Sequence, residues 1–91
     1  MNVKIIKLVS AEELIADFDE EKYIAKNPVI MIPVSKEQIA FQPWLPYAED
    51  KEYQLKESQI TLTATPSDTI KAEYTKHFGS GIVTPRSNIV M

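Results

Sequence analysis

Residues 8–34, LVSAEELIADFDEEKYIAKNPVIMIPV, constrain the fold of this chain more than any other stretch. Apolar and acidic residues alternate with period two around Leu14, Ala16 and Phe18, which is typical of a half-buried strand. A charged turn follows, and the run after Asn27-Pro28 is apolar without alternation, so neither of its faces looks solvated. We therefore expect two neighbouring strands, the second of which needs cover on both faces. In so small a protein, that need makes association with another chain the first functional question.

Five strands and then one helix are expected along the chain. The strands are predicted at residues 2–9, 14–19, 23–34 and 39–42 and within residues 52–65. Asn27-Pro28 should interrupt the third strand, because proline cannot donate a hydrogen bond to a sheet. In the last strand, Ile60, Leu62 and Ala64 alternate with polar residues, so we expect them to form one buried face. This order of elements predicts a mainly β fold, either a strongly bent sheet or a small barrel.

Helical spacing begins after this last strand. Thr65 is the expected N-cap and Pro66 the expected first helical residue. Ile70, Tyr74 and Phe78 follow on one apolar stripe, and Gly79 is a natural helix end. We expect one domain, made of a β-barrel (1–65), a C-terminal helix (66–79) and a tail packed on or near it (80–91).

Composition and charge favour a binding protein over an enzyme. The chain has a net charge of −3 and no cysteine, which excludes disulfides and thiolate metal sites. It has no apolar run long enough to span a bilayer and no signal-peptide pattern, so we expect a cytoplasmic protein that does not contact membranes. The lone His77 has no evident acid partner and no glycine-rich phosphate loop is present. We therefore expect no catalytic residues, cofactor, metal or small-molecule substrate.

Two phrases of the sequence resemble the Sm-like (LSm) family. In LVSAEELIADF a strand ends in a polar turn before the next strand begins, and YIAKN is similar to the family's third-strand signature. The phrases NPVIMIP, PWLPYA and FGSGIVTP look like a small Sm-like branch carried by marine phages (cyanophages). The resemblance implies a bent, five-stranded antiparallel barrel that assembles into a homo-oligomeric ring. For the phage-like branch it implies a pentamer, located in the host cytoplasm if the chain is phage-encoded.

The resemblance also implies which strands join the subunits. In the family, the fifth strand of one subunit pairs with the fourth strand of the next. In this chain the corresponding segments are residues 59–65 and 39–42. The expected interface residues are Ile39, Phe41, Ile60, Leu62 and Ala64.

RNA binding is the activity that the resemblance implies, and its candidate residues are Lys22, Tyr23, Lys26 and Asn27. The tyrosine would stack on a base and the lysines would contact phosphates. However, the family's base-gripping loop is shortened here to residues 19–22, and its second RNA-contact pair is absent. Together with the acidic balance, these departures favour an alternative, a protein-interaction or assembly ring that binds no nucleic acid.

Trp44 and Tyr47 lie between predicted strands, in a segment with two prolines. They either plug one end of the barrel or form a contact surface for a base or a partner.

Overall fold

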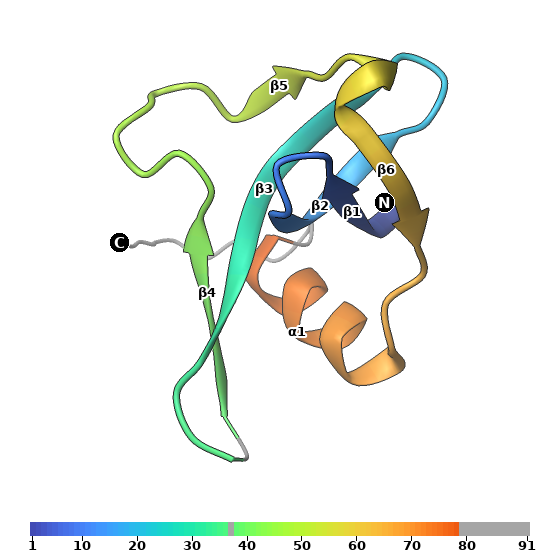
Figure 1. Ribbon diagram of the computed structural model, residues 1–91. Helices are drawn as coiled ribbons and strands as arrows, with labels where there is room; N and C mark the ends of the chain where they lie inside the picture. The colour runs from blue at the N-terminus through green and yellow to red at the C-terminus, as the bar shows by residue number, and fades with distance from the viewer. Residues whose placement is uncertain (37, 79–91) are drawn as a thin grey trace.

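The computed structural model describes residues 1–36 and 38–78. They form strands, a 3₁₀ turn and an α-helix (Figure 1). In chain order these are β1 (Val3–Leu8), β2 (Glu13–Asp19), β3 (Ile24–Pro33), β4 (Ile39–Pro43), β5 (Glu52–Gln54), the 3₁₀ turn η1 (Glu57–Gln59), β6 (Ile60–Ala64) and α1 (Asp68–Phe78).

The strands form one antiparallel sheet in the order β4-β3-β2-β1-β6, with β5 also paired to β3. The prediction of a mainly β fold with a C-terminal helix is confirmed. The sheet bends strongly around its interior (Figure 1), as in a small barrel, but it does not close. β4 and β6 stand at the two ends of the strand order, and no described residues bridge them.

Strand β3 is ten residues long, and the sheet bends along it. Its first half pairs with β5 and its second half with β4. Between the halves, Asn27 has a φ of 49° and the register with β2 shifts between Ile15 and Asp17. Pro28 follows directly, and its missing N–H prevents a regular ladder at this point. The predicted interruption at Asn27-Pro28 is therefore confirmed, and it takes the form of a bulge.

The strand expected within residues 52–65 is split in two. β5 and β6 are separated by η1, in which the Lys56 N–H donates to Gln59 Oε1 at 2.8 Å. Leu55 explains the break, because its side chain is buried in the core while its N–H donates to the Tyr23 carbonyl at 2.8 Å. The chain must therefore turn at this point before it can return alongside β1.

Two apolar clusters lie on the two faces of the sheet. The first fills the concave interior, and its buried members are Ile6, Leu8, Leu14, Ala16, Phe18, Ala25 and Leu55. The second lies between the sheet and α1, and its buried members are Val3, Ile15, Val29 and Tyr74. Alternate residues of β1 and β2 enter different clusters, as the period of a strand requires. We call the side of the sheet that α1 covers the helix face.

The start of α1 differs from the prediction. Neither Thr65 nor Pro66 caps or begins the helix; the N-cap position is taken by Ser67, whose Oγ accepts a hydrogen bond from the Ile70 N–H at 3.3 Å. The Ser67 carbonyl accepts from the Lys71 N–H at 2.9 Å. Pro66 is buried, and it belongs to the connection from β6 rather than to the first turn of the helix. A serine cap of this kind satisfies an N–H that the helix itself cannot.

The apolar stripe predicted on the helix is confirmed. Tyr74 is fully buried, with Ile70 and Phe78 packed against the same cluster. Gly79 and the tail (80–91), for which we predicted a helix end and packing near the barrel, lie outside the described residues.

The Tyr74 hydroxyl ties α1 to the bulge. It accepts a hydrogen bond from the Asp17 N–H at 3.2 Å, and it lies 2.9 Å from both the Lys26 and Asn27 carbonyl oxygens, to which it can donate. Burial raises the pKa of this hydroxyl above the usual tyrosine value, and the nearby Asp17 carboxylate acts in the same direction. The hydroxyl therefore stays neutral and supplies hydrogen bonds where the β2–β3 ladder is interrupted.

Candidate functional site

The outer edge of β4 is one candidate contact surface. β4 pairs with β3 in a regular register that places Phe41 opposite Met31. Phe41 is half-buried on the helix face, with its ring 6.3 Å from that of Tyr74 and 5.5 Å from that of His77. Ile39 lies two residues earlier on the same face and is 51% exposed. The predicted interface residues of β4 therefore share one face, and one of them is available to a partner.

The outer edge of β6 is the second candidate surface, but its side chains are not arranged as predicted. Leu8 pairs with Ile60 and Lys7 with Leu62, so a bulge at Thr61 interrupts the alternation. Ile60 packs on the interior cluster, whereas Leu62 lies on the opposite face and is 53% exposed. The expectation that Ile60, Leu62 and Ala64 form one buried face is therefore wrong, because the bulge turns Ile60 to the other side.

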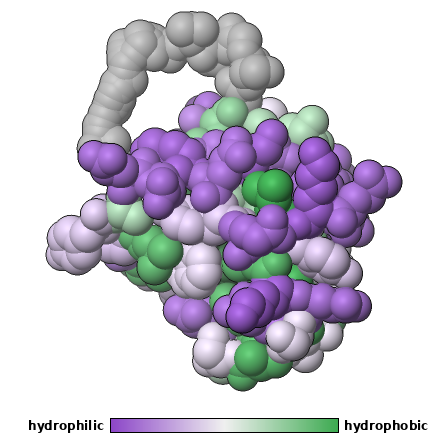
Figure 2. Space-filling view, turned by 90° about the horizontal axis from the view of Figure 1, so that it is seen from above, coloured by the Kyte–Doolittle hydropathy of each residue, from purple (hydrophilic) through white to green (hydrophobic). Residues whose placement is uncertain are grey.

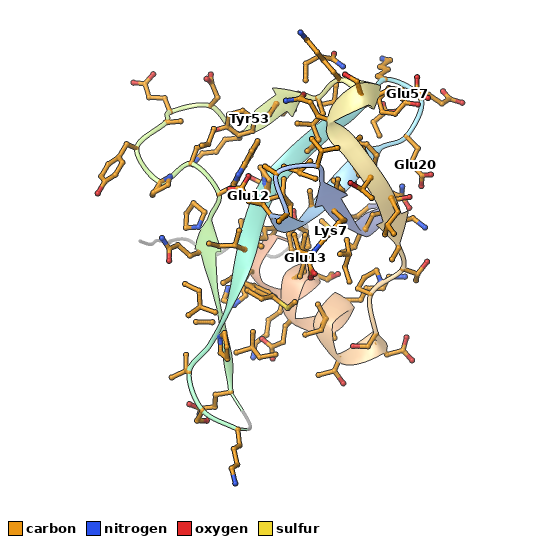
Figure 3. All side chains as sticks on the ribbon, in the orientation of Figure 1. Lys7, Glu12, Glu13, Glu20, Tyr53 and Glu57 are labelled. Atoms are coloured by element: carbon orange, nitrogen blue, oxygen red, sulfur yellow. The ribbon has the colours of Figure 1, made fainter. Side chains whose placement is uncertain are left out.

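A groove of about 280 Å³ runs along the β6 edge. Its lining residues are Phe18, Glu20, Tyr23, Glu57, Ile60, Leu62 and Thr63. Glu20 and Glu57 come from different loops and lie near one another at this corner of the molecule (Figure 3). Sequence reasoning did not bring these two glutamates together, and no local pattern could have done so.

Two of the RNA-binding candidates lie at the turn between β2 and β3. The Asp19 carboxylate accepts hydrogen bonds from the N–H groups of Glu21 (3.0 Å) and Lys22 (3.1 Å), which fixes a tight turn. Lys22 is exposed, whereas Tyr23 is partly buried, with its ring 6.2 Å from that of Phe18. Tyr23 thus packs on the interior cluster, so its ring is only partly available for stacking on a base.

The other two candidates lie at the bulge in β3. Lys26 is exposed, and the register places it opposite Asp17 on β2 and Glu52 on β5. Both of these cross-strand neighbours carry the charge opposite to that of Lys26, an arrangement that favours strand pairing. The Asn27 N–H donates to the Lys51 carbonyl at 2.7 Å, and its backbone makes the bulge. The four candidates thus belong to two separate features, a turn and a bulge.

The turn at residues 19–23 meets the end of β5 and the loop that follows it. Gln54 Nε2, on the last residue of β5, donates to the Lys22 carbonyl at 2.6 Å. The Leu55 N–H, in the loop at residues 55–59, donates to the Tyr23 carbonyl at 2.8 Å, which holds the two loops together. Figure 2 looks onto this end of the molecule and shows a mainly hydrophilic surface with smaller hydrophobic patches. The charged residues of the two loops are Asp19, Glu20, Glu21, Lys22, Lys56 and Glu57. Acids outnumber bases among them, so this end attracts phosphates poorly.

Trp44 and Tyr47 have different environments. Trp44 packs against the interior cluster, its Nε1 donates to Glu12 Oε2 at 3.3 Å, and its ring meets that of Tyr53 edge-to-face at 5.8 Å. Tyr47 is fully exposed, at 101% of its reference surface. Of the two alternatives for this segment, covering the barrel end fits Trp44, and a contact surface fits Tyr47.

His77 lies exposed on α1. Across residues 1–36 and 38–78, no three His, Asp or Glu side chains are grouped so that they could hold a metal ion. Within the same part of the chain, no helix has the length and apolar character needed to cross a bilayer.

Comparison with known proteins adds no relative from which a function could be transferred. No protein-family model matches the chain, and no curated protein matches it significantly.

Proposed function

We propose that this chain is a non-catalytic, ring-forming subunit of Sm-like type, in which β6 of one copy pairs with β4 of the next. The observation that carries the proposal is the strand order, which leaves β4 and β6 at opposite ends of an unclosed sheet.

The character of the two edges supports this pairing. β6 has the sequence ITLTA, which contains no charge or proline of the kind that usually protects an exposed edge. β4 has the sequence IAFQP, which contains no charge, and its only proline is Pro43 at the end of the strand. Each strand has five residues, so the two edges can pair along their full lengths. A bare edge of this kind exposes backbone hydrogen-bonding groups that another strand satisfies well.

Pairing one edge with a different edge of the next copy is head-to-tail. Such contacts generate a closed ring when the rotation between copies closes, and a filament when it does not. The bend of the sheet favours closure, and the pentamer is proposed from the Sm resemblance.

The experiment is a measurement of native mass by light scattering, with and without the substitution Leu62→Asp. The wild-type protein should be a ring, and the charged variant should lose assembly because an aspartate on the β6 edge must be desolvated at the contact. Tyr47→Asp is the matched control, since Tyr47 is exposed but belongs to the loop between β4 and β5 and to neither edge strand. A monomeric wild-type particle of 10.3 kDa would contradict the proposal.

RNA binding is the second candidate function. It is favoured by the exposed Lys22 and Lys26 and by the contact between the two loops, which a ring would repeat around its axis. Fluorescence anisotropy with uridine-rich and adenine-rich oligonucleotides, at low and moderate salt, tests it. Micromolar binding that is lost in Lys26→Glu would support RNA binding. If no binding is found even at low salt, assembly remains the only proposed function.

A further inference from the structure

The exposed apolar residues of β4 lie on the helix face. Phe41 packs against Tyr74 of α1, which fixes the direction of its side chain. Ile39 is two residues away, so it shares this face, and Ala40 lies on the other one. The outer edge of β4 therefore presents Ile39 and Phe41 toward the helix side.

The exposed leucine of β6 lies on the same face of the sheet. Leu62 is opposite Lys7, and residues directly opposite each other in an antiparallel pair share a face. Lys7 alternates with Ile5 and Val3, which pack against the cluster under α1. Leu62 also borders the β6 groove, as an edge residue can, but its pairing directs its side chain to the helix face.

A groove between β4 and the first half of α1 is open on this face. Its volume is about 390 Å³, and its lining combines apolar residues with the polar Gln38 and Thr69 and one charged side chain, that of Glu73. Ile39 and Phe41 line the groove from β4, and Ile70 and Glu73 line it from α1. Because Ile39 is exposed and Ile70 is half-buried, the groove offers apolar surface without a partner of its own among the described residues.

We infer that this groove receives Leu62 of the neighbouring copy, with β6 and β4 paired so that Leu62 lies opposite Phe41 and Ala64 opposite Ile39. The inference rests on the proposed function and specifies its contact. In an antiparallel pair, only registers that place Leu62 opposite Ile39, Phe41 or Pro43 keep all these side chains on one face. Of these, the register with Phe41 pairs both five-residue strands along their full lengths. α1 thereby becomes part of the assembly surface.

Charge complementarity supports a second copy as the occupant. Lys7 accompanies Leu62 on the helix face, and its ammonium donates to Glu13 Oε2 at 3.3 Å. An ammonium has three N–H donors, so it can also serve a second carboxylate. In the inferred register, Glu73 of the neighbouring groove is that carboxylate. Docking thus brings a leucine to an apolar groove and a lysine to its one acidic residue.

Cysteine cross-linking tests the register, because the chain has no cysteine of its own. Ala64→Cys protein is mixed with Ile39→Cys protein and oxidised, and the disulfide dimer is followed on a non-reducing gel. Directly opposite Cα atoms are about 4.5–5.5 Å apart, which is within the range that a disulfide spans. We expect the dimer to form about tenfold faster than in the control mixture of Ala64→Cys with Ala40→Cys, whose cysteines would lie on different faces.

The outcomes separate the inference from the function on which it rests. If the protein is a ring but Ala64→Cys cross-links to Ile39→Cys and to Ala40→Cys at equal rates, the inferred register is wrong and the ring stands. The same conclusion follows if Leu62→Cys cross-links to Ile39→Cys faster than Ala64→Cys does. If the wild-type protein is a monomer, both fail.

Charge reversal tests the inferred contact between Lys7 and Glu73 without changing either apolar cluster. Glu73→Lys should raise the protein concentration needed for assembly about twofold to fivefold, as expected for an exposed ion pair. Adding Lys7→Glu to the same chain should recover most of that loss. Unchanged assembly in Glu73→Lys would overturn the contact between Lys7 and Glu73.

Discussion

The hydroxyl group of Tyr74 gives the sharpest test of how α1 is held on the sheet. Tyr74→Phe removes only this oxygen, from a side chain that is fully buried. The substitution removes the acceptor for the Asp17 N–H at 3.2 Å and the donor for the Lys26 and Asn27 carbonyls at 2.9 Å. All three groups belong to the bulge, where the regular β2–β3 ladder cannot replace the lost bonds.

The expected loss follows from these contacts. Leaving a buried polar group without a partner costs about 1–3 kcal/mol. The three hydrogen bonds are only partly buried, so water can partly replace the hydroxyl, and we expect Tyr74→Phe to lower the free energy of unfolding by about 2 kcal/mol. The ring contacts with Phe41 and Phe78 remain, so the folded structure should be kept.

Urea denaturation followed by circular dichroism measures this difference, and Tyr47→Phe is the matched control. Tyr47 is fully exposed, so its substitution should change the free energy of unfolding by less than about 0.5 kcal/mol. Measurement at several protein concentrations separates folding from assembly. A loss below about 0.5 kcal/mol in Tyr74→Phe would refute the reasoning that this hydroxyl supports the bulge.

Three further predictions concern the same fold. Because the pKa of Tyr74 is raised in the folded protein, its hydroxyl stays protonated above pH 10.0 while that of the unfolded chain ionises. The Tyr74 contribution to stability should therefore be fully present below about pH 10 and fall by at most about 1.4 kcal/mol per pH unit above it. When the free energy of unfolding is measured at increasing alkaline pH, it should fall less steeply in Tyr74→Phe than in the wild type. Ala11 has a φ of 81°, so Ala11→Gly should raise the thermal midpoint through a gain of about 0.5–1 kcal/mol, whereas Ala16→Gly, in a buried strand, should lower it. Ser67→Ala should cost about 1 kcal/mol in urea denaturation by removing the N-cap, and unchanged stability would contradict the cap assignment.

Ala11 lies in the turn between β1 and β2 with a positive φ. Glycine adopts such a left-handed backbone more easily than alanine does. In this chain an alanine holds that conformation, with a φ of 81°. The turn geometry is thus kept at a cost in strain, and the Ala11→Gly variant measures that cost.

The sequence alone predicted the elements whose pattern is local. The alternation of faces in β2, the interruption at Asn27-Pro28 and the stripe of Ile70, Tyr74 and Phe78 each follow from short-range spacing, and the structure agrees. The expected half-burial of β2 is wrong, because Ile15 on its second face is buried under α1. The mainly β character and the C-terminal helix could therefore be predicted from the sequence alone. The N-cap was misplaced by two residues, because Thr65 and Ser67 are both good caps and only the path out of β6 decides between them.

Tertiary structure decided what depends on distant partners. The bulge at Thr61 arises in the pairing of β6 with β1, and it turns Ile60 and Leu62 to different faces, which no pattern within β6 reveals. The groove between β4 and α1 likewise joins segments about thirty residues apart in the chain. Periodicity specifies which residues of a strand share a face, but only pairing specifies where that alternation breaks and which faces are left uncovered.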